Sequence, residues 1–394
     1  MSLTPPVAVP VFLGSALVSL GMSWVLVSRL ERLAERAGLS EGLLGVIAAL
    51  AADAPEITSA VTALAHHQQR VGAGVVIGSN VFNLAALLGL GAVVAGSIAL
   101  HRHVVVLGGV VSVWIAGVCV VMVLGFLSPV AGIIVTGLVF VPYLIALGMD
   151  GRPLPRLPRR LAGWLATAVI EEEAELAEAI HPPRGRPRDA FVAVAALVLV
   201  VTASAAMAVA AVALGRHYAV PGIVTGGVVL AGVTSLPNAV AAVYLAAKGK
   251  GAAVLSTALN SNALNVIAGL MLPAAITGLG RPSSQAALVA GWYAGLTLFA
   301  LAVAYRYRGL RRAAGFLIIG AYLVFLCSLL TIAYAILPTA AGAIVPAAAV
   351  AAICLLWLAP KPAALAPRPA PAASPASDAP ASSGDPPVPD PDAS

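Results

Sequence analysis

Two acidic residues stand out because they lie inside an apolar stretch of the chain. Asp53 and Glu56 fall within the run 41–66, and of the sixteen acids they are the only two that lie well inside such a run. A charge at the centre of a membrane helix costs roughly 2.5–3.5 kcal/mol on insertion scales. The apolar runs contain no Lys or Arg to pair with them. The pattern therefore predicts that cations from solution bind these two side chains.

The spacing of the two acids indicates the kind of cation. Residues three apart share one face of a helix, so both carboxylates point the same way. Pro55 lies between them, and a proline removes a backbone hydrogen bond and frees carbonyl groups nearby. Carboxylate, amide, hydroxyl and carbonyl oxygens are hard ligands that suit sodium and calcium rather than zinc or copper. Protons are candidates too, because hydrocarbon favours the neutral form of a carboxyl group.

The composition places these residues in a membrane. Of the 394 residues, 60% are hydrophobic and 10% are charged, and the mean hydropathy is +0.99. Soluble chains are about 25% charged, which excludes a soluble enzyme, a nucleic-acid binder or a disordered scaffold. Apolar runs of about 20 residues predict an all-α polytopic protein of the lipid bilayer. The predicted spans are 8–28, 41–66, 71–99, 104–126, 129–149, 191–214, 221–247, 251–279, 285–304, 313–335 and 339–359.

The basic residues predict the orientation. If the N-terminus is outside, nineteen of the 22 Lys and Arg residues lie inside, and only Arg70, Arg216 and Arg281 remain outside. The positive-inside rule therefore favours an outer N-terminus and a cytoplasmic C-terminus in the cell membrane.

The chain also matches itself when it is shifted by 182 residues without a gap. The matched pairs are Gly45 with Gly227, Pro55 with Pro237, Ser79 with Ser261, Asn80 with Asn262, and Asn83 with Asn265. Five spans lie in each copy, and because five is odd the second copy enters the membrane inverted. Inverted repeats bring substrate sites to the bilayer midplane, where broken helices meet. The predicted parts are a first repeat (8–149), a cytoplasmic loop (150–190), a second repeat (191–335), an additional helix (339–359) and a disordered Pro/Ala-rich tail (360–394).

The repeat supplies further oxygen ligands. Thr234, Ser235 and Asn238 surround Pro237 in the second copy. In each copy a serine and an asparagine four residues apart share a helix face, so each pair can line one wall of a site. These pairs are Ser79 with Asn83 and Ser261 with Asn265. The alternative is that these groups only form hydrogen bonds between helices.

At these residues the chain resembles the calcium/cation antiporter superfamily, which includes the sodium/calcium exchangers. The motifs are ADAPE (52–56) and GSNVFN (78–83) in the first copy, and VTSLPN (233–238) and NSNALN (260–265) in the second. The resemblance covers about residues 10–335. It implies transport by alternating access, in which the first and sixth helices slide against the remaining bundle. The transported ions would be Ca²⁺ or another divalent cation, with Na⁺ or H⁺, and neither a cofactor nor an oligomer is required.

The resemblance also implies a ligand set. A central divalent site falls on Glu56, Asn83, Asn238 and Asn265, and flanking sodium ligands fall on Ser79, Thr234, Ser235, Ser261 and the carbonyls of Ala49 and Ala231. The chain departs from the family where Asn238 replaces the usual Glu, where Asn265 replaces a frequent Asp, and where Ala52-Asp53 replaces Thr-Ser. We expect Asp53 to compensate for a lost acid across the site. Two acids favour electroneutral or low-charge exchange over three sodium ions for one calcium ion.

Other interpretations remain open at this stage. The fold could carry a monovalent Na⁺/H⁺ antiporter, a channel or a transport-inactive regulator. An intramembrane transferase is disfavoured because such enzymes need more acids and basic phosphate partners.

Three further features complete the predictions. The acidic stretch 171–178 predicts a solvated helix face, with a calcium sensor or a membrane-surface helix as alternatives. The histidines at span ends favour interfacial positions, and the cysteines favour neither a disulfide nor a metal cluster. These residues are His66, His67, His101, His103, Cys119, Cys327 and Cys354.

Overall fold

The computed structural model describes residues 3–149, 158–179, 185–248 and 250–334, which form helices and two short strands joined by turns and loops. The first half contains α1 (Pro5–Ala37), α2 (Glu41–Ala52), α3 (Ala54–Ala65), α4 (Gln69–Asn83), the π-helix η1 (Leu84–Leu90), α5 (Gly91–Ala95), β1 (Ser97–Ala99), α6 (Arg102–Val123), α7 (Pro129–Leu147) and α8 (Arg159–Ala179). The second half contains α9 (Pro187–His217), α10 (Gly222–Val224), η2 (Thr225–Leu230), α11 (Ala231–Thr234), α12 (Leu236–Ala247), α13 (Gly251–Leu264), η3 (Asn265–Met271), α14 (Leu272–Thr277), α15 (Ser284–Tyr307), β2 (Gly309–Arg311) and α16 (Arg312–Ala333).

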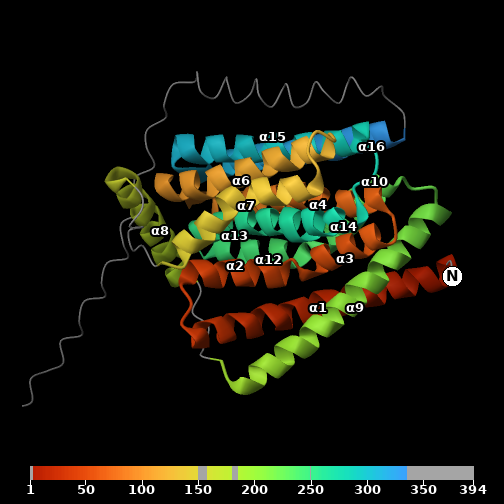
Figure 1. Cartoon of the computed structure of the whole chain (residues 1–394), viewed down its shortest axis with the longest axis horizontal. Helices are drawn as coiled ribbons and strands as arrows, with labels where there is room; N and C mark the ends of the chain where they lie inside the picture. Colours follow the sequence, from red (N-terminus) through yellow and green to blue (C-terminus); the bar gives the residue numbers. More distant parts are fainter. Residues whose placement is uncertain (1–2, 150–157, 180–184, 249, 335–394) are drawn as a thin grey trace, which may run out of the picture. The chain divides into compact units, whose positions relative to one another are not determined.

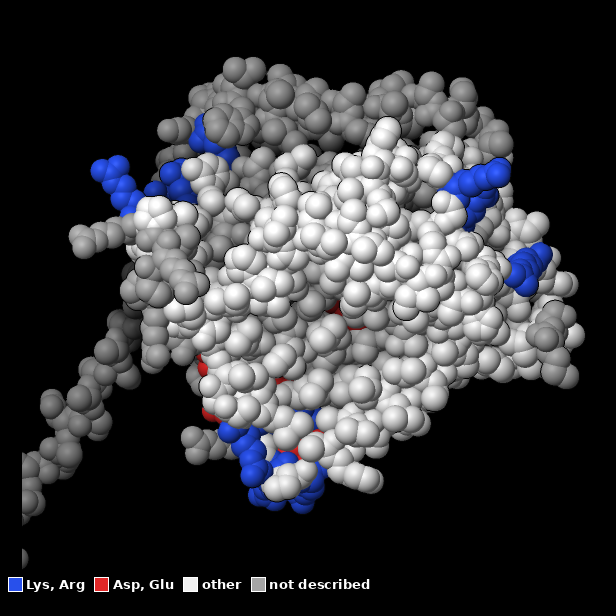
Figure 2. Space-filling view, in the orientation of Figure 1, with Lys and Arg blue, Asp and Glu red and all other residues white. Residues whose placement is uncertain are grey.

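The helices confirm a multi-spanning membrane protein. Within the described ranges, eight helices are long and apolar enough to cross a bilayer, and two bent helix pairs raise the number to as many as ten. Figure 2 shows a broad, mostly uncharged surface on the face in view, with Lys and Arg at its margins. The predicted eleventh helix (339–359) and the predicted tail (360–394) lie outside the described residues.

The first and sixth predicted spans are longer than the sequence indicated. Helix α1 ends at Ala37 rather than near residue 28, and α9 begins at Pro187 rather than near residue 191. The two extensions stabilise one another, because Arg29 Nη1 lies 2.8 Å from Asp189 Oδ1. Helix α1 packs against α9, and the two cross one another in Figure 1.

Both predicted helix breaks occur at the expected prolines. Helices α2 and α3 meet at a bend of 50° and share Asp53 as their boundary residue. The segment Gly222–Thr234, which comprises α10, η2 and α11, meets α12 at a bend of 46°, and Ser235 is the boundary residue. Ser235 lies 182 residues after Asp53, so the bends are repeat equivalents. Pro55 and Pro237 cannot donate the hydrogen bonds that would continue each helix.

Glycines allow the two repeats to approach closely between α4 and η2. Helix α4 packs against η2, and a Cβ added to Gly78 would lie 2.5 Å from the Cα atom of Gly227. No side chain larger than hydrogen fits there, so the backbones touch directly. The π-helix η1 begins at Leu84, directly after the motif residue Asn83. The π-helix η3 begins at Asn265, which is the repeat equivalent of Asn83. Such π segments frequently occur at functional sites.

The loop predicted at 150–190 contains helix α8, which packs against α2, α6, α7 and α13. The prediction of a solvated acidic face is wrong for Glu172, which is only 3% exposed and accepts a 2.7 Å hydrogen bond from Ser256 Oγ. Glu171 lies 3.0 Å from His103 Nδ1. The packing of α8 on the helix bundle therefore overrides the charge pattern that predicted solvent exposure.

Candidate cation-binding site

The two helix bends bring the first repeat's acids against the second repeat. Asp53 Oδ1 accepts hydrogen bonds from Asn238 Nδ2 at 2.7 Å and from Ser261 Oγ at 2.6 Å. Glu56 Oε1 accepts one from Ser235 Oγ at 2.8 Å. All five side chains are at most 1% exposed. Each acid therefore reaches across the boundary between the repeats.

These contacts follow the internal symmetry. Asp53 and Ser235 are repeat equivalents at the bends, and Glu56 and Asn238 are equivalents three residues later. Asp53 is hydrogen-bonded to Asn238, and Ser235 is hydrogen-bonded to Glu56. The residue at the bend of each repeat therefore bonds to the residue three positions past the bend of the other repeat. The symmetry is broken only in chemistry, because the first repeat supplies both acids and the second supplies a hydroxyl and an amide.

A second layer consists of asparagine side chains. Asn83 Nδ2 donates to Ser261 Oγ and to Asn262 Oδ1, both at 3.2 Å. Asn265 Nδ2 donates to Asn80 Oδ1 at 3.4 Å. Asn80 and Asn262 were not among the predicted ligands, although the 182-residue shift had paired them. Their place in the repeat was the signal that could have identified them.

Four buried oxygens of the predicted ligand residues have no hydrogen-bond partner among the described residues. They are Asp53 Oδ2, Glu56 Oε2, Asn83 Oδ1 and Asn265 Oδ1. Leaving a buried polar group unsatisfied is costly, and a buried carboxylate without a counter-charge is more so. Two carboxylates and two amide oxygens are a hard donor set, which fits sodium or calcium.

The remaining predicted ligands form hydrogen bonds with groups within one turn of their own helix. Ser79 Oγ donates to Val76 O at 3.0 Å, and Thr234 Oγ1 donates to Leu230 O at 2.9 Å. The carbonyls of Ala49 and Ala231 accept backbone hydrogen bonds from Asp53 and Ser235. The described contacts do not join Ser79, Thr234 or these two carbonyls to either carboxylate. Ser79 Oγ, Thr234 Oγ1 and Ala49 O each keep a lone pair that could bind an ion, whereas Ala231 O also accepts a 3.4 Å hydrogen bond from Thr234 Oγ1.

The described residues contain no group of three or more His, Cys, Asp or Glu side chains that could hold a metal ion. The candidate site therefore depends on amides and hydroxyls to complete a ligand set around two acids. Cys119 is buried and Cys327 is exposed, and both are free thiols. Cys354 lies outside the described residues.

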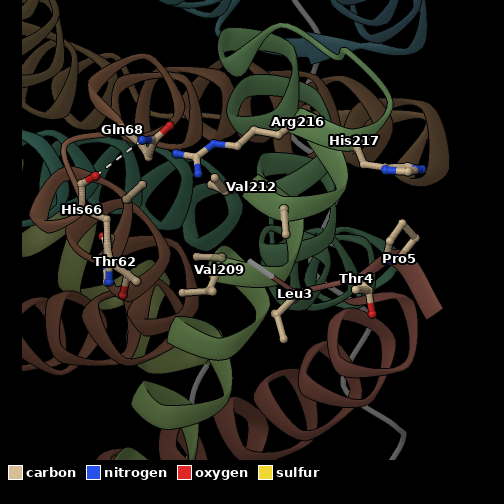
Figure 3. Close-up of a pocket in the computed structure, with 13 residues that line it drawn as sticks. Leu3, Thr4, Pro5, Thr62, His66, Gln68, Val209, Val212, Arg216 and His217 are labelled. Carbon is tan, nitrogen blue, oxygen red and sulfur yellow. Dashed lines mark hydrogen bonds between the residues drawn. The ribbon is translucent and has the colours of Figure 1, made fainter. Parts of the chain in front are cut away.

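A pocket of about 720 Å³ opens at one end of the helix bundle, where α1 begins and α3 and α9 end. Thr62, His66 and Arg216 are among its lining residues (Figure 3). Its lining also includes Ala63 and Ala208, which lie one helical turn beyond Ser59 and Ser204. Along α3, Ser59 therefore lies in the layer of side chains between Glu56 and the lining residues Thr62 and Ala63.

That layer is closed by serines. Ser19 Oγ and Ser204 Oγ are 2.7 Å apart, and Ser59 Oγ donates to Ser204 O at 3.4 Å. All three side chains are fully buried. They join α1, α9 and α3 at the level between the pocket and the bends.

Comparisons with known proteins agree with this architecture. The sequence model of the family described as "Sodium/calcium exchanger protein" matches residues 7–149 and 189–331. A comparison with curated protein sequences found no match.

Two solved structures are similar over most of the chain. The crystal structure of the H⁺/Ca²⁺ exchanger CAX has a TM-score of 0.67 at 14% identity, covering 89% of this chain and 87% of its own. The sodium-calcium exchanger NCX_Mj has a TM-score of 0.55 at 19% identity, covering 82% of this chain and 98% of its own. At such low identities, these likenesses support the fold alone.

Proposed function

Because this chain belongs to the sodium/calcium exchanger family, we propose that it is a secondary active antiporter that exchanges a divalent cation, with Ca²⁺ as the first candidate, for Na⁺ or H⁺. The family is one of transporters, so the transferase alternative is set aside. The site residues, the exchanged ions and the orientation that follow are parts of this proposal.

The observation that carries the proposal is the set of four unsatisfied oxygens on Asp53, Glu56, Asn83 and Asn265. Two of them belong to carboxylates that are fully buried. A bound cation supplies the charge and the coordination that the described side chains do not. Asn238 and Ser261 hold the Asp53 carboxylate from the second repeat, so the ion contacts groups fixed by both halves.

Alternating access requires one group of helices to move against another. Helices α1 and α9 pack against each other and lie against α2 and α3. The side-chain hydrogen bonds across this boundary include Ser23 Oγ to Ala51 O and Ser59 Oγ to Ser204 O, both 3.4 Å long. Contacts this long are weak, which suits a sliding boundary.

The pocket at the N-terminal end of α1 is the outer mouth in this proposal. The distribution of Lys and Arg favours that end as the outside of the cell membrane. Displacement of α1 and α9 would separate Ser59 from Ser204 and open the layer above Glu56 to the pocket. The opposite displacement would open the site to the cytoplasm.

The test is radiocalcium uptake into proteoliposomes with sodium and proton gradients imposed separately. We expect uptake driven by at least one gradient, and its loss in the Asp53→Asn and Glu56→Gln double variant. The matched control is Glu35→Gln, which removes a carboxylate from the charged end of α1. Normal exchange by the double variant would contradict the site assignment.

A second candidate is monovalent Na⁺/H⁺ exchange on the same site. It is favoured by Asn238 and Asn265, which leave the second repeat without an acid at the centre. Radiosodium uptake driven by a pH gradient, without calcium uptake under any gradient, would support it. Flux without coupling to a counter-ion would indicate a channel, and no flux of any ion would indicate a regulatory relative.

A further inference from the structure

Asn80 and Asn262 form a reciprocal pair at the boundary between the repeats. Asn80 Nδ2 donates to Asn262 O at 3.0 Å, and Asn262 Nδ2 donates to Asn80 O at 3.2 Å. Both side chains are at most 1% exposed. The backbone carbonyl can only accept, so it fixes which end of each amide is nitrogen.

This orientation leaves the amide oxygen of each residue facing the next asparagine along the opposite repeat. Asn262 Oδ1 accepts from Asn83 Nδ2, and Asn80 Oδ1 accepts from Asn265 Nδ2. Asn83 uses its nitrogen twice, because it also donates to Ser261 Oγ. The nitrogen ends of Asn83 and Asn265 are therefore both held by acceptors.

These hydrogen bonds fix the direction of the amide dipoles of Asn83 and Asn265. With their nitrogens held, Asn83 and Asn265 present Oδ1, and both of these fully buried amide oxygens lack a hydrogen-bond partner among the described residues. A flipped amide would instead present N–H groups, which repel a cation. The orientation of each amide thus decides whether it attracts or rejects the transported ion.

We propose that Asn80 and Asn262 are positioning residues for cation binding, each acting through one asparagine of the other repeat: Asn262 through Asn83, and Asn80 through Asn265. This inference rests on the proposed function. Neither Asn80 nor Asn262 needs to contact the ion. Loss of a residue that orients a metal ligand typically weakens metal binding about 10–100-fold.

The test uses double-variant cycles, read as equilibrium binding of radiocalcium and radiosodium to the purified full chain. Asn262→Ala and Asn80→Ala are each expected to weaken binding about 10–100-fold. Asn262→Ala should add little once Asn83→Ala is present, and Asn80→Ala should add little once Asn265→Ala is present. The crossed combination of Asn80→Ala with Asn83→Ala should be additive.

Two further variants separate positioning from general damage. Asn260→Ala makes the same change on α13, at a side chain that bonds to Tyr143 Oη and Ser256 Oγ, and it should leave binding unchanged. Asn262→Asp keeps an acceptor for Asn83 and should bind at least tenfold more tightly than Asn262→Ala. Additivity in the matched pairs, or equal loss in Asn262→Asp and Asn262→Ala, would overturn the inference. If the unaltered chain bound and transported neither ion, the proposed function itself would fail instead.

Discussion

At the residue scale, the position of Asp53 explains how the second repeat can lack an acid. Its carboxylate lies 2.7 Å from the amide nitrogen of Asn238, the position where the resemblance noted in the sequence implies a Glu. The negative charge therefore lies on Asp53, the hydrogen-bond partner of Asn238, rather than at position 238 itself. In the proposed mechanism, the site keeps two carboxylates although both come from one bend.

This geometry predicts that the charge can be moved back across the boundary. Asn238→Glu alone places two carboxylates within hydrogen-bond distance and should lower transport at least tenfold, because like charges in a buried site repel. Asp53→Ser alone should also lower transport, because one charge is removed. The double variant restores one charge at the boundary and should recover much of the activity. Radiocalcium or radiosodium uptake measures the cycle, and additive losses would contradict the displacement of charge.

At the residue scale, the sequence predicted the chemistry of the site but not its connections. Asp53, Glu56 and the paired Ser and Asn residues were predicted as ion ligands from their place in apolar runs and from their spacing, and these ligand roles remain a prediction. The cross-repeat bonds of Asp53 with Ser261, and of Asn83 with Asn262, depend on how two distant helices pack. A helix-periodicity argument orders residues along one helix only, so it could not supply these pairs.

At the element scale, α1 and α9 are joined by an ion pair at the end opposite the pocket. Asp189 Oδ1 accepts from Arg29, and its other oxygen accepts from the backbone N–H of Arg186. The same carboxylate therefore begins α9 and attaches it to α1. If the two helices move together during transport, this contact keeps them in register.

Arg29→Gln should therefore slow transport several-fold without changing the apparent affinity for the cation. The Arg29 side chain is partly exposed, so its loss should weaken the contact between α1 and α9 only modestly. Initial rates of radiotracer uptake at several cation concentrations separate the two effects. Arg188→Gln removes a positive charge from the same end of α9 and serves as the control. A changed affinity with an unchanged maximal rate would contradict the role in movement.

At the element scale, sequence patterns predicted the helix bends but not the helix ends. Both bends were predicted, because a proline blocks the helix wherever the chain is placed. The extensions of α1 and α9 were not, since charged residues end a hydrophobic run but not a helix. The acidic stretch 171–178 was predicted as a solvated helix face, yet Glu172 is buried against α13, where it accepts a hydrogen bond from Ser256.

At the scale of the whole molecule, the repeats depend on direct backbone contact between α4 and η2. Gly78→Ala would force a Cβ against the backbone of Gly227, and relief requires the repeats to separate. We expect destabilisation of about 1–3 kcal/mol, seen as a lower midpoint of thermal unfolding in detergent. Gly117→Ala on α6 has no atom within 4 Å of the added Cβ and should be neutral. Equal stability of the two variants would contradict the importance of this contact.

The whole molecule also constrains the charge that the proposed cycle can carry. The site has two carboxylates, and no Lys or Arg side chain pairs with either in the described ranges. One Ca²⁺, two Na⁺ or two protons each bring it to neutrality, whereas three Na⁺ would leave a buried positive charge in hydrocarbon. The site therefore has its lowest electrostatic free energy, with either transported ion bound, when the exchange is electroneutral.

Electroneutral exchange predicts that the membrane potential has no effect on calcium accumulation. Moving one net charge per cycle across 100 mV changes the driving force by about 2.3 kcal/mol, or about fifty-fold in the accumulated ratio. Proteoliposomes with a valinomycin-imposed potassium potential should reach the same radiocalcium ratio at 0 and at about 100 mV. The proton or sodium gradient must be held constant, and a chain carrying Asn238→Glu offers a comparison with one more negative charge at the site. A shift of the accumulated ratio with potential in the unaltered chain would mean that the two carboxylates do not set the charge of the transported load.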